Sequence, residues 1–181
     1  TEFVDNNFSG TMSLLLRVDG DMKSPLVLNS ISEIQHYIES HKEVKMTLSL
    51  SDIIKQMHKT LYNDDIYYTI PKNRSQIGNL IFMAPSEQLS TVVNTTTYNR
   101  GMIHSYLVSL STDEIVEISN DIENFIDANI ENDIHIESSG LMILLRDFIS
   151  LVINSSIISI GVSIFAIFII SLIFFRGIFW A

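Results

Sequence analysis

The apolar and polar positions along the first part of the chain predict a strand, a helix and a second strand. Residues 11–19 (TMSLLLRVD) are rich in Leu and Val and predict a strand that ends at Gly20-Asp21. Residues 44–48 predict another, shorter strand. Ser24-Pro25 suits the start of the helix between them, which runs to about Ser40. Its apolar residues recur every three or four positions and form one face: Leu28, Ile31, Ile34 and Ile38.

The middle of the chain predicts a helical insertion. Ser49 or Ser51 caps a helix with these residues on its apolar side: Ile53, Ile54, Met57 and Leu61. Residues 62–71 (YNDDIYYTIP) predict an irregular loop with a turn at Asn63-Asp64-Asp65. A further short helix is predicted over residues 75–83, and Pro85 closes it.

Two strands and a helix are predicted after the insertion. Residues 89–97 and 100–110 predict strands around a turn at residues 98–101. The second strand carries apolar residues on both faces, which suits a strand inside a covered sheet. Ser111 and Glu114 form a capping box for a helix to about Asn129. Its apolar stripe is Ile115, Ile118, Ile122, Phe125 and Ile126.

The order of these elements predicts an α+β domain over residues 1–140. Residues 134–138 form the last predicted strand, and Gly140 is the expected hinge before a long C-terminal helix. Without the weak strand at 44–48, the strong elements give a four-stranded sheet. One layer of helices would cover it in a ferredoxin-like, split β-α-β arrangement, with residues 49–90 inserted.

The C-terminal part, residues 141–181, predicts a transmembrane helix. No Asp, Glu, Lys, Arg or His occurs from Phe148 to Phe175. A helix that crosses a bilayer needs about 20 apolar residues, and residues 157–175 supply most of them. The alternative is a helix buried in a soluble core, but the preceding domain is too small to surround a helix that is apolar on every side.

Charge predicts which side of the membrane the domain occupies. All 21 acidic residues and 10 of the 11 Lys and Arg residues lie at or before Asp147, while Arg176 follows the apolar run. Basic residues next to a span favour the cytoplasmic side, so residues 1–147 are expected on the periplasmic or extracellular side. The net charge of −10 argues against nucleic acid as a partner. The chain has no Cys, which excludes disulfides and thiolate metal sites.

The sequence predicts no catalytic, cofactor-binding or metal-binding residues, so we expect a protein that is not an enzyme. The His residues show no pair at the spacing that places two ligands on one helix face: His36, His41, His58, His104 and His135. There is no phosphate-binding loop, serine elbow or zinc motif. A turn accounts for Asp64-Asp65, and a solvated face accounts for the carboxylates of the helix after Ser111.

Two further features leave alternatives open. The aromatic loop of Tyr62, Tyr67 and Tyr68 either lines a pocket for an apolar molecule or packs the inserted helices against the sheet. Ser and Gly residues in the C-terminal helix would provide a small-residue face for another helix: Ser155, Ser156, Ser159, Gly161, Ser163 and Ser171.

The order of short motifs along the chain resembles a family of transporters. The motifs are NFSGT (7–11), LLLRVDGD (14–21), VKMTLSLSDIIK (44–55), Ile70-Pro71, RSQI (74–77), YNR (98–100), LSTDEI (110–115), Ser139-Gly140-Leu141 and FFRG (174–177). In this order they resemble the resistance–nodulation–division superfamily, and more narrowly its hydrophobe/amphiphile efflux-3 branch near the mycobacterial large membrane protein type. Asn154-Ser155-Ser156 departs from that family, in which a Ser-Gln pair is more usual.

The resemblance implies that the chain is an extracytoplasmic domain, together with the transmembrane helix after it, of a multi-pass exporter in the cell (inner) membrane. Such proteins have twelve helices and two outside domains, and they use proton flow to export lipids or other hydrophobic and amphiphilic compounds. The expected partners are therefore these compounds, the membrane, the remaining helices, the second outside domain and possible further copies of the same protein. Proton-relay residues would lie in other helices.

Two other functions are compatible with a domain followed by one apolar helix. The first is the outside sensing domain of a membrane-anchored signalling receptor. The apolar residues 177–181 do not begin the charged, dimerising segment that such a receptor needs. The second is a component of a protein-export complex.

Overall fold

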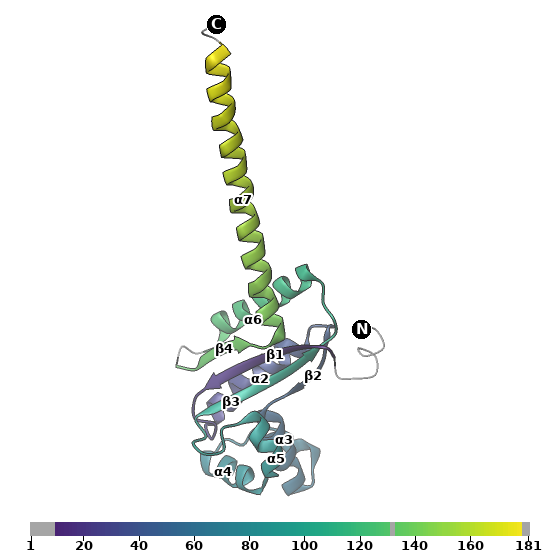
Figure 1. Cartoon of the computed structure of the whole chain (residues 1–181). Helices are drawn as coiled ribbons and strands as arrows, with labels where there is room; N and C mark the ends of the chain where they lie inside the picture. Colours follow the sequence, from purple (N-terminus) through teal and green to yellow (C-terminus); the bar gives the residue numbers. More distant parts are fainter. Residues whose placement is uncertain (1–9, 131–132, 179–181) are drawn as a thin grey trace. The chain divides into compact units, whose positions relative to one another are not determined.

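The computed structural model describes residues 10–130 and 133–178, with side chains as far as Phe175. Part of the NFSGT motif and the side chain of Arg176 therefore lie outside the described residues. The chain divides into two compact units, one that ends at Leu144 and one that begins at Leu145. Figure 1 labels the helices and strands of both units.

A four-stranded antiparallel sheet forms the centre of the first unit. Its strands are β1 (Met12–Asp19), β2 (Val44–Leu48), β3 (Arg100–Leu107) and β4 (His135–Ser139). They lie in the order β2-β3-β1-β4, and every neighbouring pair is antiparallel. The prediction of an α+β fold with a four-stranded sheet is confirmed, although β2 takes the place of the strand predicted over residues 89–97.

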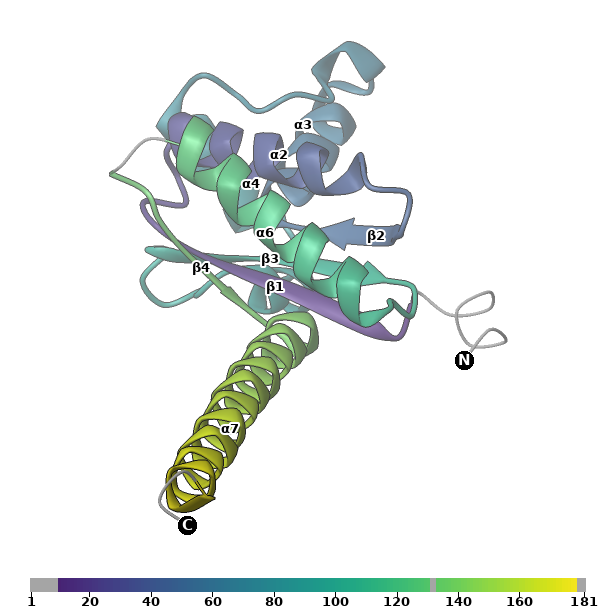
Figure 2. The same ribbon diagram turned by 90° about the horizontal axis from the view of Figure 1, so that it is seen from above.

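Two helices, α2 (Pro25–Glu39) and α6 (Thr112–Asn129), lie on the same face of this sheet (Figure 2). The predicted apolar stripe of α2 is the centre of the core, since each of its members is at most 1% exposed: Leu28, Ile31, Ile34 and Ile38. Ser24 occupies the N-cap position of α2, but its side chain makes no capping hydrogen bond.

Helix α6 begins as predicted and buries most of its predicted stripe. Ser111 and Glu114 form the capping box, in which each side chain bonds the other residue's backbone. Ile115, Ile118 and Ile122 are buried. Phe125 is half-buried and stacks on Tyr37 of α2, with the ring centroids 3.8 Å apart. The apolar spacing therefore identified the face of α6 that packs on α2 and the sheet.

Alternation along the strands gives the sheet one buried face and one partly exposed face. In β1 the residues that point toward α2 and α6 are at most 6% exposed: Met12, Leu14, Leu16 and Val18. In β3 the buried positions include Ile103 and Leu107, while Met102, His104 and Tyr106 are partly exposed. The apolar residues predicted on both faces of β3 are present, but only one face is fully covered within the first unit.

The insertion between β2 and β3 contains α3 (Leu50–Tyr62), the 3-10 turn η1 (Asp65–Tyr67), α4 (Arg74–Met83) and α5 (Ser86–Val92). The helices α3 and α4 are the two that were predicted in the insertion. Ser49 caps α3 through its side chain, and Asn63 ends it in the left-handed conformation at φ 53°. Leu61 was expected on the apolar side of α3 but is 50% exposed. The buried position in the preceding turn is occupied by His58.

The strand predicted over residues 89–97 is wrong. Pro85 starts a helix there, and Leu89 and Val92 point inward from it at three-residue spacing. Only Val93 has strand character, as an isolated bridge to Gly101. The β-branched run Thr91-Val92-Val93 favoured a strand by local propensity, and packing of the helix against the sheet overrides it.

Gly140 joins β4 to the C-terminal helix in a conformation that few other residues adopt. Its φ is +100°, and a Cβ atom there would lie 2.7 Å from the backbone oxygen of Ser13. The next residues, Met142 and Ile143, are buried in the first unit. The predicted hinge position is thus a tight turn against β1 in which glycine is required.

The C-terminal helix α7 (Leu141–Ile178) is long and apolar enough, by length and composition, to cross a membrane. The stretch Leu141–Phe175 has 35 residues, and its most apolar window has a mean hydropathy of 2.9 with none of it buried. This one helix is compatible with association with a membrane.

Charged side chains cross three strands on the partly exposed face of the sheet. Arg17 of β1 pairs with Glu137 of β4 at 2.6 Å and with Asp19 at 3.1 Å. Arg100 of β3 approaches Asp19 from the other side at 2.8 Å. Arg17–Glu137 and Asp19–Arg100 are direct cross-strand pairs, so they reinforce the register of β3, β1 and β4.

Acidification is expected to remove the contribution of Asp19 to stability. The hydrogen bond from Arg100 is the main cause that holds the pKa of Asp19 below its ordinary value of 3.8, and the charge of Arg17 adds to it. A lowered folded pKa stabilises the fold above the unfolded pKa, and that contribution is lost as pH falls through the folded pKa. Asp19→Asn should therefore cost about 1 kcal/mol or less at pH 7, because solvent screens both arginines.

Thermal unfolding of the wild type and Asp19→Asn at pH 7 and at about pH 3 measures this effect. The difference in Tm between the two proteins should shrink at the lower pH. A difference of equal size at both values would contradict a stabilising role for the ionised carboxylate.

Candidate functional site

An open pocket with mainly apolar walls lies where the insertion meets the sheet. It has a volume of about 420 Å³ and is lined by Leu48, Ile53, Glu87, Gln88 and Thr91. Leu48 comes from β2, Ile53 from α3 and the other three from α5. Pockets of this size are large enough for a small organic ligand. We call it the insertion pocket.

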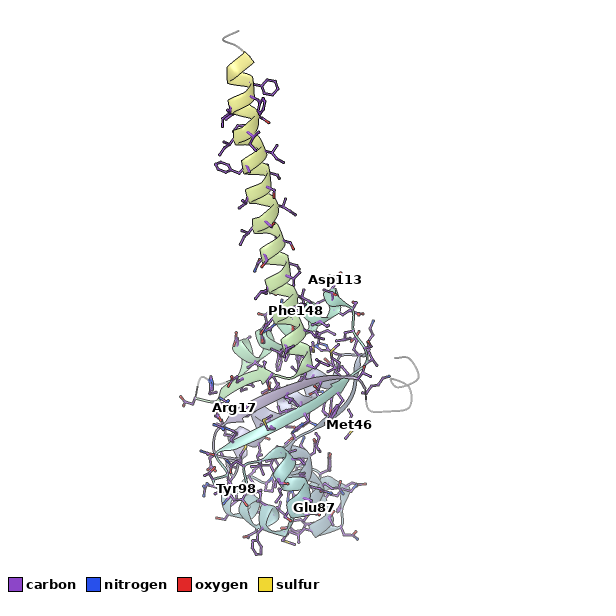
Figure 3. All side chains as sticks on the ribbon, viewed as in Figure 1. Arg17, Met46, Glu87, Tyr98, Asp113 and Phe148 are labelled. Carbon is purple, nitrogen blue, oxygen red and sulfur yellow. The ribbon has the colours of Figure 1, made fainter. Side chains whose placement is uncertain are left out.

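Local structure explains why these side chains meet. Leu48 is opposite His104 in the sheet, so both point to the face away from α2 and α6. The Nε2 of His104 donates a hydrogen bond of 2.8 Å to the backbone oxygen of Thr91, which ties α5 to that face. Met46 precedes Leu48 by two residues, shares its face and is 43% exposed, so apolar surface continues along β2. Figure 3 labels Met46 and, on α5, Glu87.

A buried polar cluster fixes the corner between Leu48 and Ile53. Gln35 of α2 is 5% exposed, and its amide group reaches both sides of this corner. Its Nε2 donates to Thr47 Oγ1 at 2.7 Å and to Asp52 Oδ2 at 2.6 Å, and its Oε1 accepts from Ser49 Oγ at 2.5 Å. The side chain of Gln35 thus links the end of β2 to the start of α3, and this link positions both apolar walls of the insertion pocket.

Replacing Gln35 with Leu is expected to destabilise the first unit by about 1–3 kcal/mol, because it removes one hydrogen-bond partner each from the buried Ser49 hydroxyl and the half-buried Asp52 carboxylate. The measurement is thermal unfolding of the full chain. Glu33→Leu is the matched control, since Glu33 is an exposed position of the same helix. Equal Tm values for the two variants would contradict a structural role for the cluster.

Three other pockets of the first unit have polar or charged walls. One is lined by Lys59, Thr60 and residues 63–65, and an ion pair between Lys59 and Asp65 crosses it. A second lies between α6 and β4. The third is bordered mostly by charged residues: His41, Lys42, Glu43, Glu114, Glu117, Ile118 and Asp121. The insertion pocket is the one of these four whose walls suit an apolar molecule.

Two tyrosines of the aromatic loop pack around His58 of α3. Tyr62 and Tyr67 stack with their centroids 4.3 Å apart, and each meets the ring of His58 edge-on at 5.4 Å. His58 also contacts the backbone oxygen of Thr69 through Nδ1 at 2.8 Å. The loop therefore packs on the end of α3, and no tyrosine of this loop lines the insertion pocket.

The histidines are dispersed. His58 is buried in the insertion, His104 lies on the sheet and His41 follows α2, while His36 and His135 are exposed. Within residues 10–130 and 133–178 there is no group of three His, Asp or Glu side chains that could hold a metal ion. Sequence reasoning missed Gln35 and the insertion pocket. Gln35 lies between members of the apolar stripe of α2. A polar residue at such a position is the signal that could have identified it.

No protein-family model, no curated protein and no solved structure matches this chain.

Proposed function

We propose that this chain is the substrate-handling outside domain, together with the following transmembrane helix, of a proton-driven exporter of lipids or other hydrophobic or amphiphilic compounds. The exporter would belong to the resistance–nodulation–division superfamily, in its hydrophobe/amphiphile efflux-3 branch. The observation that carries the proposal is the direct passage from β4 through the tight turn at Gly140 into an apolar helix long enough for a bilayer.

The strand order supports a ferredoxin-like, porter-type domain. In a split β-α-β unit, a third strand lies between the two strands that a helix connects. Here α2 connects β1 to β2, and β3 lies between them. The second half has the same pattern, since α6 connects β3 to β4 and β1 lies between these two strands. The helices α3, α4 and α5 are then an insertion between two strands of the porter-type core.

The insertion pocket supports a role in handling apolar molecules. Leu48 and Ile53 give it walls that an apolar group can cover, and the partly exposed face of the sheet adds Met46. The span from Phe148 to Phe175 has no ionisable side chain. In this proposal the proton relay therefore belongs to other helices of the parent protein, and this chain binds or guides the substrate.

Reading the gene on both sides of this segment tests the proposal. We expect about twelve hydrophobic spans, a second outside domain and acidic residues inside at least one span. Deleting the gene should then reduce proton-dependent export of lipids or amphiphiles from the cells, and the intact gene should restore it. One span upstream and a soluble signalling domain downstream would overturn the exporter and identify a receptor instead.

A further inference from the structure

The carboxylate of Glu87 stands at the insertion pocket without a partner in the described part of the chain. Its backbone oxygen accepts a hydrogen bond from Ser90, but its side chain makes no hydrogen bond and no ion pair within residues 10–130 and 133–178. By contrast, the carboxylate of Asp21 is paired with Arg74 at 2.7 Å. The side chain of Gln88, next along α5, also makes no hydrogen bond within these ranges.

The lining of the pocket includes no cation that would neutralise Glu87. None of the five lining residues is Lys, Arg or His. The whole chain carries a net charge of −10, so the long-range field also favours a positive ligand over a negative one. An apolar wall with one free carboxylate at its rim is complementary to a molecule that has an apolar group and one positive charge.

We propose that the insertion pocket binds a small organic cation. The apolar group of the ligand lies against Leu48 and Ile53, and its cationic centre lies beside the carboxylate of Glu87. A volume of about 420 Å³ accommodates one aromatic ring with a quaternary ammonium group. The inference deepens the proposed function, since it rests on this pocket as the substrate-handling site and names the class of compound that the pocket selects.

The test uses the full chain in nanodiscs of digalactosyldiacylglycerol, a neutral lipid without an amine that would compete. The probe is benzyltrimethylammonium, and phenylmethanesulfonate is the anion of similar size. Nuclear magnetic resonance of the methyl groups of Ile53 and Thr91 follows binding at the pocket. We expect saturable shifts of both methyl groups with the cation and none with the anion.

Three variants test the carboxylate, the space inside the pocket and a control carboxylate in turn. Glu87→Gln should weaken the affinity for the cation about fivefold to tenfold, because the charge is removed and the shape is kept. Thr91→Trp should abolish binding by filling the pocket, while the backbone bond from His104 to residue 91 is retained. Asp113→Asn is the matched control, because Asp113 is an exposed carboxylate that Figure 3 shows at the opposite end of the first unit from Glu87. It should bind the cation like the wild type.

The outcomes separate the inference from the exporter proposal. Absence of saturable shifts with the cation would overturn the inference. An affinity that Glu87→Gln leaves unchanged would overturn it too, since the pocket would then select no charge. The measurement needs no transport, so a chain that binds the cation and proves to be part of a receptor would retain the inference and lose the exporter.

Discussion

Ile160→Arg is expected to hinder insertion of the chain into a membrane. An Arg at the centre of a span costs about 2.5–3.5 kcal/mol on insertion scales. That corresponds to a shift in the insertion equilibrium of roughly 70-fold to 400-fold. The effect is large because Ile160 is close to the middle of the uncharged stretch from Phe148 to Phe175.

The span has little room to shift around the new charge. The uncharged stretch has 28 residues and would be about 42 Å long as a helix, compared with about 30 Å of hydrocarbon. Arg at position 160 leaves 12 uncharged residues on one side and 15 on the other. Both are shorter than the roughly 20 residues that a spanning helix needs.

Extraction of cell membranes at alkaline pH measures the inserted fraction. Ile160→Leu is the matched control and should remain in the membrane pellet like the wild type. A larger fraction of Ile160→Arg should appear in the supernatant or be degraded. Wild-type retention of Ile160→Arg in the pellet would contradict the assignment of α7 as the span.

Leu16→Ala is expected to be the most damaging single truncation in the first unit. Leu16 is 0% exposed and lies in β1 between Ile103 of β3 and Ser138 of β4. Leu-to-Ala changes at such positions cost about 2–5 kcal/mol, because a cavity remains after the lost burial. Against a total stability of about 5–15 kcal/mol, this loss would remove a large share of the stability of the unit.

Hydrogen exchange of the β1 and β3 amides in the full chain, held in lipid nanodiscs, measures the loss. Leu26→Ala is the matched control, since Leu26 of α2 is 47% exposed and its truncation should change stability by about 0.5 kcal/mol or less. Leu16→Ala should speed exchange at the most protected amides far more than the control. Equal rates for the two variants would show that the sheet is not organised around Leu16.

The parts of the fold that sequence reasoning predicted are those with a strong period. The stripe of α2 and the capping box of α6 each depend on local spacing, which predicts the buried face of the first helix and the start of the second. Helix α5 was not predicted from its spacing. With only 7 residues it shows too few turns to reveal a period, and its β-branched residues point to a strand.

The candidate site could not be predicted because its residues are far apart in the sequence. Leu48, Ile53 and Thr91 meet only through the pairing of β2 with β3 and the bond from His104 to α5. The sequence contains no motif for that arrangement. The tyrosine loop was singled out for its composition, but its rings pack on His58 at the end of α3.

Topology mapping with single cysteines tests the central claim, that an outside domain is joined to a membrane span. This chain has no native Cys. Once any Cys elsewhere in the parent protein is replaced, Thr60→Cys, at an exposed position of α3, and Gly177→Cys each give one labelling site. In intact cells that express the whole parent protein, we expect a membrane-impermeant maleimide to label Thr60→Cys at once and Gly177→Cys only after the membrane is permeabilised. Labelling of both sites in intact cells, or of Gly177→Cys alone, would contradict the account.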